Sequence, residues 1–158
     1  MFGLFKAKKQ TIVSPADGDV VNLSEVPDQV FSEKMAGDGI AITPRSNTFV
    51  APISGVVTKI FSTNHAYSIK AKNGLEVLVH IGLDTVALKG EGFKRLVEEG
   101  ETVSTGQSII SADLEYIKSQ GKKIITPIVL NYGKKMTLKI HSIRTVREGE
   151  SLLEVTFK

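Results

Sequence analysis

The chain has 158 residues and a formal net charge of +3, with 41% hydrophobic and 23% charged side chains. This length suits one domain with a sizeable core, and this composition is typical of a globular protein. The chain has no cysteine, which excludes disulfides, thiolate metal sites and thiol nucleophiles and fits a cytoplasmic location. The small charge and the 6% of aromatic residues argue against a nucleic-acid partner. No apolar run is long enough for a transmembrane helix.

We interpret residues 1–10 as a flexible tail and residues 11–158 as a single domain. The tail begins with the apolar tip Met1–Phe5, and Lys6, Lys8 and Lys9 follow it. This tip lacks the long apolar core of a secretory signal. The strongest membrane interaction that we expect of the tail is a weak contact with anionic lipid.

Short β-rich runs, separated by Gly, Pro, Asn and Asp, recur along the chain. Among them, Ser14–Leu23 resembles Ala51–Ile60, 37 residues later, since each copy has proline, two residues, glycine and then a strand. Proline and glycine at this spacing indicate a tight turn into a strand, so the motif is duplicated. We expect strands at Thr11–Val13, Asp19–Leu23, Ile40–Thr43, Gly55–Ile60, Ala66–Ala71, Glu76–His80, Ser108–Ala112, Ile125–Leu130, Thr137–Ile140 and Leu152–Thr156.

The pair Asn73-Gly74 predicts the two-residue turn of a β-hairpin that carries two of the three histidines. In that register His80 faces Tyr67, and His65 faces Gly82. The two histidines then become diagonal neighbours on one face of the sheet, about 7–8 Å apart at the backbone. Their rings are therefore expected to meet.

The same register pairs Thr63 with Asp84 on that face, and Phe61 and Leu78 give it an apolar surround. A hydroxyl, two imidazoles and a carboxylate in one place indicate chemistry rather than packing. The alternative stays open, because a single histidine on a strand is most often structural. A one-residue bulge would also turn one ring to the other face.

Two helical segments are expected after the hairpin. Leu114–Gln120 has Asp113 as its N-cap and Gly121 just past its end, and residues 92–100 favour a second, short helical turn. Residues 132–145 follow no pattern, and we expect His141 to be structural or solvated. The predicted fold is an all-β, antiparallel sandwich/barrel hybrid with a duplicated strand-turn motif and one or two short helices.

Three runs carry a resemblance to a known family: Val26–Ile42, Thr63–Ala66 and Val79–Lys94. In this order they resemble the glucose-class IIA component of the bacterial phosphoenolpyruvate–sugar phosphotransferase system. The resemblance covers about residues 11–130 and weakens after Asn131. The ends of the sequence favour a separate protein over a domain fused to a permease.

The resemblance implies a phosphocarrier. His80 matches the histidine that receives a phosphoryl group on Nε2 from the carrier HPr, and the group then passes to a cysteine of a permease IIB domain. His65 matches the supporting histidine, which can donate to the phosphoryl oxygens. A backbone carbonyl holds the other nitrogen of the phosphorylated histidine in the family, and Gly82 would supply it here. Thr63 is expected to orient His65.

A docking surface is expected around these groups. Asp28 and Asp84 would receive a basic residue of the donor, as matching aspartates do in the family. Exposed apolar residues around a polar centre are typical of an interface. The matching positions are Val30, Phe31, Met35, Ala36, Phe61, Leu78 and Val86. We expect Phe31→Asp to weaken transfer from HPr without unfolding the protein.

Three other classes of protein are alternatives to a phosphocarrier. Glu33–Ala36 superficially resembles the lysine tip of a biotinyl domain but lacks a methionine before the lysine. A zinc peptidase of the duplicated β-rich type would need a His-x-His pair, which the chain lacks. A purely regulatory module that binds other permeases or kinases is the serious alternative, because the same surface could serve it.

The predicted transfer needs no cofactor, because a phosphohistidine donor is already activated and the chain has no glycine-rich nucleotide loop. Zinc is a separate question. The imidazoles of His65 and His80 supply half of a tetrahedral zinc site. Zinc is therefore expected, if at all, at an interface where a partner adds a carboxylate.

Overall fold

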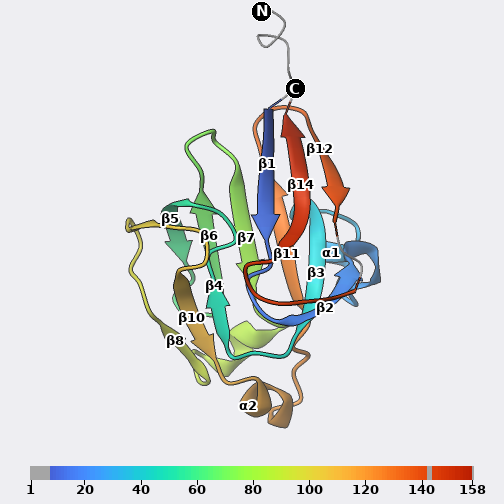
Figure 1. The fold of residues 1–158 in the computed structure, drawn as a ribbon. Helices are drawn as coiled ribbons and strands as arrows, with labels where there is room; N and C mark the ends of the chain where they lie inside the picture. The colour runs from blue at the N-terminus through green and yellow to red at the C-terminus, as the bar shows by residue number, and fades with distance from the viewer. Residues whose placement is uncertain (1–7, 142–143, 158) are drawn as a thin grey trace, which may run out of the picture.

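The computed structural model describes residues 8–141 and 144–157, which form mostly antiparallel strands (Figure 1). The helices are α1 (Gln29–Ser32) and α2 (Leu114–Ser119), with short 3₁₀ helices at Leu23–Glu25 and Thr85–Leu88. The strands are β1 (Lys8–Val13), β2 (Gly18–Asn22), β3 (Asp38–Pro44), β4 (Thr48–Val50), β5 (Gly55–Ile60), β6 (Ala66–Lys70), β7 (Glu76–His80), β8 (Phe93–Arg95), β9 (Thr102–Val103), β10 (Ser108–Ala112), β11 (Thr126–Asn131), β12 (Met136–Ile140), β13 (Thr145–Val146) and β14 (Ser151–Phe157). The predicted all-β class is confirmed.

The strands form three open sheets whose orders mirror one another. The eight-stranded sheet runs β13-β2-β3-β11-β7-β6-β5-β9, and the three-stranded sheets run β1-β14-β12 and β4-β10-β8. Exchanging β1, β2 and β3 with β4, β5 and β6, β11 with β7, and β12, β13 and β14 with β8, β9 and β10 maps the large sheet onto itself and one small sheet onto the other. The molecule is thus built from two similar halves that meet between β11 and β7.

The duplicated motif lies where these halves touch. Val13 N donates to Pro52 O at 3.0 Å, and Val50 N donates to Pro15 O at 2.8 Å, so the two copies bind each other reciprocally. Because each donor and each acceptor lies 37 residues from its counterpart, the pair of bonds obeys the same spacing as the sequence repeat. The predicted internal duplication is confirmed.

The eight-stranded sheet buries side chains on both faces. In β3, Ile40 and Ile42 enter the main core, which collects side chains from all three sheets, whereas Ala41 between them points to a smaller cluster. Alternate residues of a strand face opposite sides, so one strand serves both cores. The smaller cluster, called the second cluster below, consists of Leu23, Val26, Phe31, Ala41, Leu83 and Val129. It attaches α1 and the first 3₁₀ helix to the sheet.

Most of the expected elements are present. All ten predicted strands occur, and α2 begins as expected, with Asp113 accepting a hydrogen bond from Tyr116 N at 3.1 Å. α2 lies at the end of the molecule opposite the start of β1 and the end of β14 (Figure 1). Among the described residues, no helix is long and apolar enough to cross a membrane.

Two predictions of local structure are wrong. The expected helical turn at residues 92–100 is absent, because Phe93–Arg95 pairs with β10 as β8. Lys8, Lys9 and Gln10, which the sequence assigns to the flexible tail of residues 1–10, instead pair with β14 in β1. Residues 1–7 lie outside the described part of the chain, so the weak membrane contact of the tail stays a prediction.

Candidate functional site

The histidine hairpin has a different turn from the predicted one. Ala71 N donates to Leu75 O at 2.8 Å, which makes the loop three residues long and ends it at Gly74, with φ 93°. Such loops combine a turn with a left-handed residue. The register therefore shifts by one, and His80 pairs with Ala66 instead of Tyr67. The predicted pairing is wrong.

The two histidine rings nevertheless meet, with centroids 4.9 Å apart and planes at 78°. His65 lies just before β6 and directly after Asn64, whose φ of 60° is left-handed, so strand alternation does not fix its direction. Arg95 Nε donates to Asn64 Oδ1 at 2.7 Å and holds this turn. The predicted meeting of the rings is confirmed, and the backbone turn at Asn64 offsets the shifted register.

His65 is buried, with 3% of its surface exposed. Its Nδ1 is hydrogen bonded to the Thr63 hydroxyl at 2.6 Å, as expected, and the Phe61 and Phe93 rings lie edge-on at 5.2 and 6.5 Å. Burial, helped by the neighbouring His80, lowers the pKa of His65 from 6.5 to about 4. His65 is therefore neutral at pH 7.

His80 is fixed in one tautomer by the backbone. Its Nδ1 lies 2.8 Å from Gly82 O, and because a carbonyl only accepts, Nδ1 carries the proton and Nε2 keeps its lone pair. Burial lowers the pKa of His80, while the Gly82 carbonyl and the charges of Asp28 and Asp84 act in the opposite direction. The ring is therefore neutral at pH 7, with Nε2 unprotonated.

Gly82 occupies a position that only glycine fits. Its φ is 76°, and a Cβ atom would lie 2.6 Å from Thr85 Cγ2 and 2.7 Å from Lys123 O. The buried Thr85 hydroxyl donates to Ile81 O at 2.6 Å and fixes the same loop. Sequence reasoning did not single out Thr85 or the Asn64–Arg95 pair, since both act through the backbone that they hold.

The charges of the two aspartates act on His80 from different elements, and their expected contact with a partner stays a prediction. Asp28 is the N-cap of α1 and accepts from Val30 N at 3.0 Å. Asp84 is exposed and precedes the second 3₁₀ helix, with φ 56°. The strand pair that was expected between Thr63 and Asp84 is wrong, because the ladder of β6 and β7 ends at Ala66 and His80.

The predicted apolar rim divides into an exposed and a buried part. Val30, Met35 and Val86 are 47%, 71% and 56% exposed, and Ala36, Phe61 and Leu78 are half-buried. Phe31 is only 6% exposed, and its ring packs 5.2 Å from His80. The expected exposure of Phe31 is wrong, because α1 turns it into the second cluster.

This burial also changes the expected effect of Phe31→Asp. A carboxylate at residue 31 would enter an apolar cluster with no charged partner supplied by that cluster, at a cost of several kcal/mol. Phe31→Asp is therefore expected to destabilise the fold, contrary to the expectation from the sequence. Contact of Phe31 with a partner stays a prediction.

The site supplies only part of a metal centre. Both Nδ1 atoms are engaged, so the two Nε2 atoms are the nitrogens left to bind zinc. The described part of the chain brings no three His, Cys, Asp or Glu residues together as a metal site. Two imidazoles fit half of a tetrahedral zinc site, and a partner would have to add the other ligands.

Comparison with known proteins shows the family of the chain. The model of the family described as phosphoenolpyruvate-dependent sugar phosphotransferase system, EIIA 1, matches residues 10–136. The chain belongs to this family. As an EIIA component it takes part in phosphoryl transfer within the sugar phosphotransferase system.

Several known EIIA proteins are similar to this chain over almost its whole length. The glucose-specific EIIA component of Bacillus cereus is 50% identical, over 100% of this chain and 98% of the relative. The glucose-specific EIIA component of Haemophilus influenzae is 44% identical, over 94% and 89%. The solved glucose permease IIA from Mycoplasma capricolum is 41% identical and has a TM-score of 0.88, covering 93% of this chain and 96% of that one. The predicted family and β-sandwich fold are confirmed.

The lowered pKa of His65 predicts how the stability of this EIIA depends on pH. Between pH 6.5 and 5 the unfolded His65 gains a proton that the folded one does not, so stability falls as the pH falls. At about 1.4 kcal/mol per pH unit, this window costs about 2 kcal/mol. Urea unfolding at pH 7, 6 and 5 measures it, and His65→Gln should flatten the dependence. Parallel curves for both proteins would contradict the assignment.

Proposed function

We propose that this EIIA chain is a phosphocarrier that binds the phosphoryl group covalently at Nε2 of His80. It accepts the phosphoryl group from phospho-HPr and passes it to a cysteine of a sugar permease IIB domain in the cytoplasm. The observation that carries this proposal is the Nδ1 contact of His80 with the Gly82 carbonyl at 2.8 Å. That contact supports an unprotonated Nε2, which attack on phosphorus requires.

In the first step His80 Nε2 forms a bond to phosphorus as the bond to the donor histidine breaks, and that histidine keeps the electron pair. In the second step a cysteine thiolate takes the phosphoryl group, and the electron pair returns to Nε2. Both steps start from an activated phosphoryl group, so positioning supplies most of the catalysis. No nucleotide or metal is required by this chemistry.

His65 is proposed to stabilise the transferred group. Its ring lies 4.9 Å from that of His80, and the Thr63 hydroxyl can donate to Nδ1, which leaves the proton on Nε2. A donor at this place stabilises charge on the phosphoryl oxygens in the transition state. Thr63 then acts as a positioning residue, and Gly82 has that role for His80.

The names of relatives support the kind of acceptor. A Klebsiella pneumoniae relative named N-acetylglucosamine-specific EIICBA component is 51% identical over 76% of this chain, which corresponds to 18% of that protein. The name EIICBA joins the letters C, B and A, which supports a IIB domain as the partner that receives the phosphoryl group from EIIA. Since other relatives are named glucose-specific, we propose that the permease sets the sugar.

The same surface is proposed to bind both partners. Val30, Met35 and Val86 provide exposed apolar area, and the charges of Asp28 and Asp84 lie close enough to act on His80. An apolar patch with acidic groups fits a partner with an apolar face and a basic residue. A zinc shared by His65, His80 and a carboxylate of a regulatory partner, such as another permease or a kinase, is compatible with this arrangement.

Met35→Asp is expected to raise the KM for phospho-HPr about tenfold with little change in kcat, because it places a charge within the apolar patch. Initial rates at varied phospho-HPr measure this. Ile140→Asp is the matched control, since Ile140 is 41% exposed in β12, which carries no site residue. An equal effect of both variants would exclude Met35 from the docking surface.

The function is tested by incubating the protein with phosphoenolpyruvate, enzyme I and HPr. Acid-labile phosphate on the chain, and its later transfer to a purified IIB domain, would support the carrier. No label with a donor system that phosphorylates another EIIA would overturn it. That result would leave a regulatory binding module on the same scaffold.

A further inference from the structure

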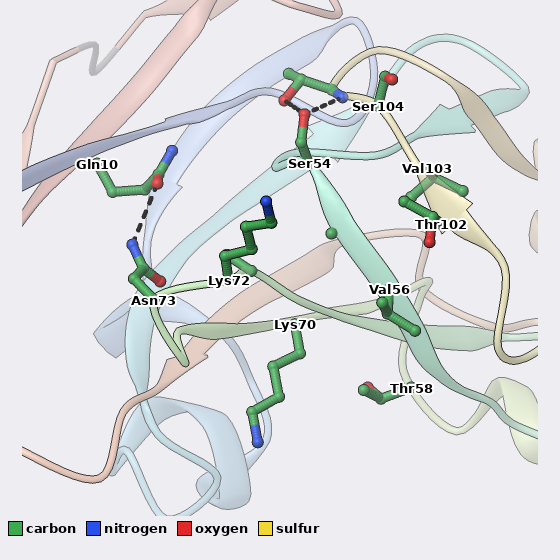
Figure 2. A pocket seen from close by; sticks show the side chains of 13 residues that line it. Gln10, Ser54, Val56, Thr58, Lys70, Lys72, Asn73, Thr102, Val103 and Ser104 are labelled. Atoms are coloured by element: carbon green, nitrogen blue, oxygen red, sulfur yellow. Dashed lines mark hydrogen bonds between the residues drawn. The ribbon is translucent and has the colours of Figure 1, made fainter.

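A cavity of about 740 Å³ lies on the β5–β6–β9 edge of the large sheet (Figure 2). Its lining combines the apolar Val56 with the hydroxyls of Ser54 and Thr102 and with two lysines, Lys70 and Lys72. Cavities of this size hold small molecules. In Figure 2 the side chain of Lys72 extends towards Ser54, whereas that of Lys70 extends the opposite way.

The other half of the molecule contains a counterpart of this place. Asp19 pairs with Thr43 and Thr145 there, as Val56 pairs with Lys70 and Thr102 here. Arg45 follows Thr43 by two residues, as Lys72 follows Lys70. The counterparts are therefore Asp19 for Val56, Arg45 for Lys72 and Thr145 for Thr102.

Hydrogen bonds confirm that the two places are equivalent. Glu148 N donates to Asp17 Oδ1 at 2.8 Å in one half, and Thr105 N donates to Ser54 Oγ at 2.8 Å in the other. Asp17 and Ser54 are 37 residues apart, which is the spacing of the sequence repeat. The backbone frame is thus the same, and the side chains differ.

In the counterpart a carboxylate fills the position. Asp19 Oδ2 lies 2.7 Å from Arg45 Nη2, and Thr145 Oγ1 donates to Asp19 Oδ1 at 2.8 Å. One carboxylate is thus held by a cation and a hydroxyl. This is the arrangement that carboxylates favour.

In the cavity the cation and the hydroxyl are kept and the carboxylate is missing. Val56 replaces Asp19 and is 40% exposed. Within residues 8–141 and 144–157, Lys72 has no ion pair and the Thr102 hydroxyl has no hydrogen bond. A cation, a hydroxyl donor and the apolar Val56 therefore line the same cavity, and neither polar group has a partner among the described residues.

We propose that this cavity binds a small organic carboxylate with an apolar part. The carboxylate takes the place of the missing Asp19 counterpart, between Lys72 and Thr102, and the apolar part lies on Val56. The two histidines belong to the other end of the β6–β7 hairpin, so this binding site is separate from the transfer site. Its binding is independent of the carrier function.

Isovalerate is a suitable probe, because it joins a carboxylate to an isopropyl group that is as large as the Val56 side chain on which it would lie. Titration into the ¹⁵N-labelled full chain should shift the amide signals of Gly55, Val56 and Val103 in a saturable way. Isovaleramide, which has the same shape without charge, should shift them at least tenfold less at equal concentration. Inorganic phosphate tests charge alone, and it should bind at least tenfold more weakly than isovalerate.

Two variants test the site. Lys72→Met keeps the length of the side chain but removes its charge, and it should weaken isovalerate binding at least tenfold. Lys70→Met is the matched control and should reduce it less than twofold. Val56→Asp restores the pair of the other half, and it should abolish isovalerate binding while the melting temperature stays equal or rises.

Three results would overturn the proposal. The first is no saturable shift with isovalerate on the wild-type chain. The second is equal binding of phosphate, which would mean an adventitious ion only. The third is full isovalerate binding by folded Lys72→Met and Val56→Asp. The folded state of each variant is checked from its amide spectrum, so failure to fold is told apart from failure to bind.

Discussion

His80→Gln is expected to lower the rate of phosphoryl acceptance from phospho-HPr by a factor of at least about 10⁴, because it removes the nucleophile itself. Glutamine keeps an amide near the place of the ring but offers no lone pair of comparable basicity to phosphorus. Acid-labile label after incubation with phosphoenolpyruvate, enzyme I and HPr is the measurement. We expect label on the wild type and none on the variant.

His141→Gln provides the matched control for this experiment. His141 is the third histidine, and it is exposed and hydrogen bonded to the Ser151 hydroxyl, away from the paired rings. It should keep the full label. Label on His80→Gln, or its loss from His141→Gln, would move the phosphorylated position away from His80. Thermal melting of both variants shows whether a loss reflects unfolding.

His65→Gln is expected to separate the two transfer steps. The variant should still accept phosphate on His80, because the Gly82 contact that frees Nε2 does not involve His65. Onward transfer to the IIB cysteine should slow by about 10²–10³, the usual cost of losing one donor to a charged transition state. Single-turnover transfer from the isolated phosphoprotein measures this step alone.

A second observation would distinguish this role from a structural one. The unphosphorylated His65 has a pKa of about 4, and a phosphate next to it should raise that pKa, since the charged form gains a partner. Nitrogen-15 shifts of the ring before and after phosphorylation report it. Normal onward transfer in His65→Gln, or an unmoved pKa, would remove His65 from the mechanism.

The positions of the longer strands could be predicted from local patterns of apolar residues and turn residues in the sequence. Strands such as β3 and β11 alternate between two buried faces, and turn residues bound them, so their positions could be predicted. The four strands that were not expected, β4, β8, β9 and β13, have only two or three residues. So short a run shows no periodicity, and only its partner strand defines it.

The candidate site could be predicted only in part. The rings of His65 and His80 meet as expected, although the hairpin register differs. Asn73 Oδ1 accepts from Leu75 N at 3.0 Å and supports a three-residue loop, which the Asn-Gly pair alone does not distinguish from a two-residue one. Phe31 was misjudged because α1 has four residues, too few to reveal which side faces inward.

The intertwined order of the two halves has a consequence for folding during synthesis on the ribosome. Among the described residues β1 pairs with β14 alone, and β2 pairs with β3 and with β13, so the first half is closed by strands from the last fifteen residues or so of the chain. A ribosome releases the N-terminal end first, yet β14, the strand that pairs with β1, is complete only when Ser151–Phe157 has been made. Such distant pairings are slow to form, because the entropy of closing the loop is lost before any contact is gained. The nascent chain must therefore hold β1 without its strand partner through almost all of its synthesis.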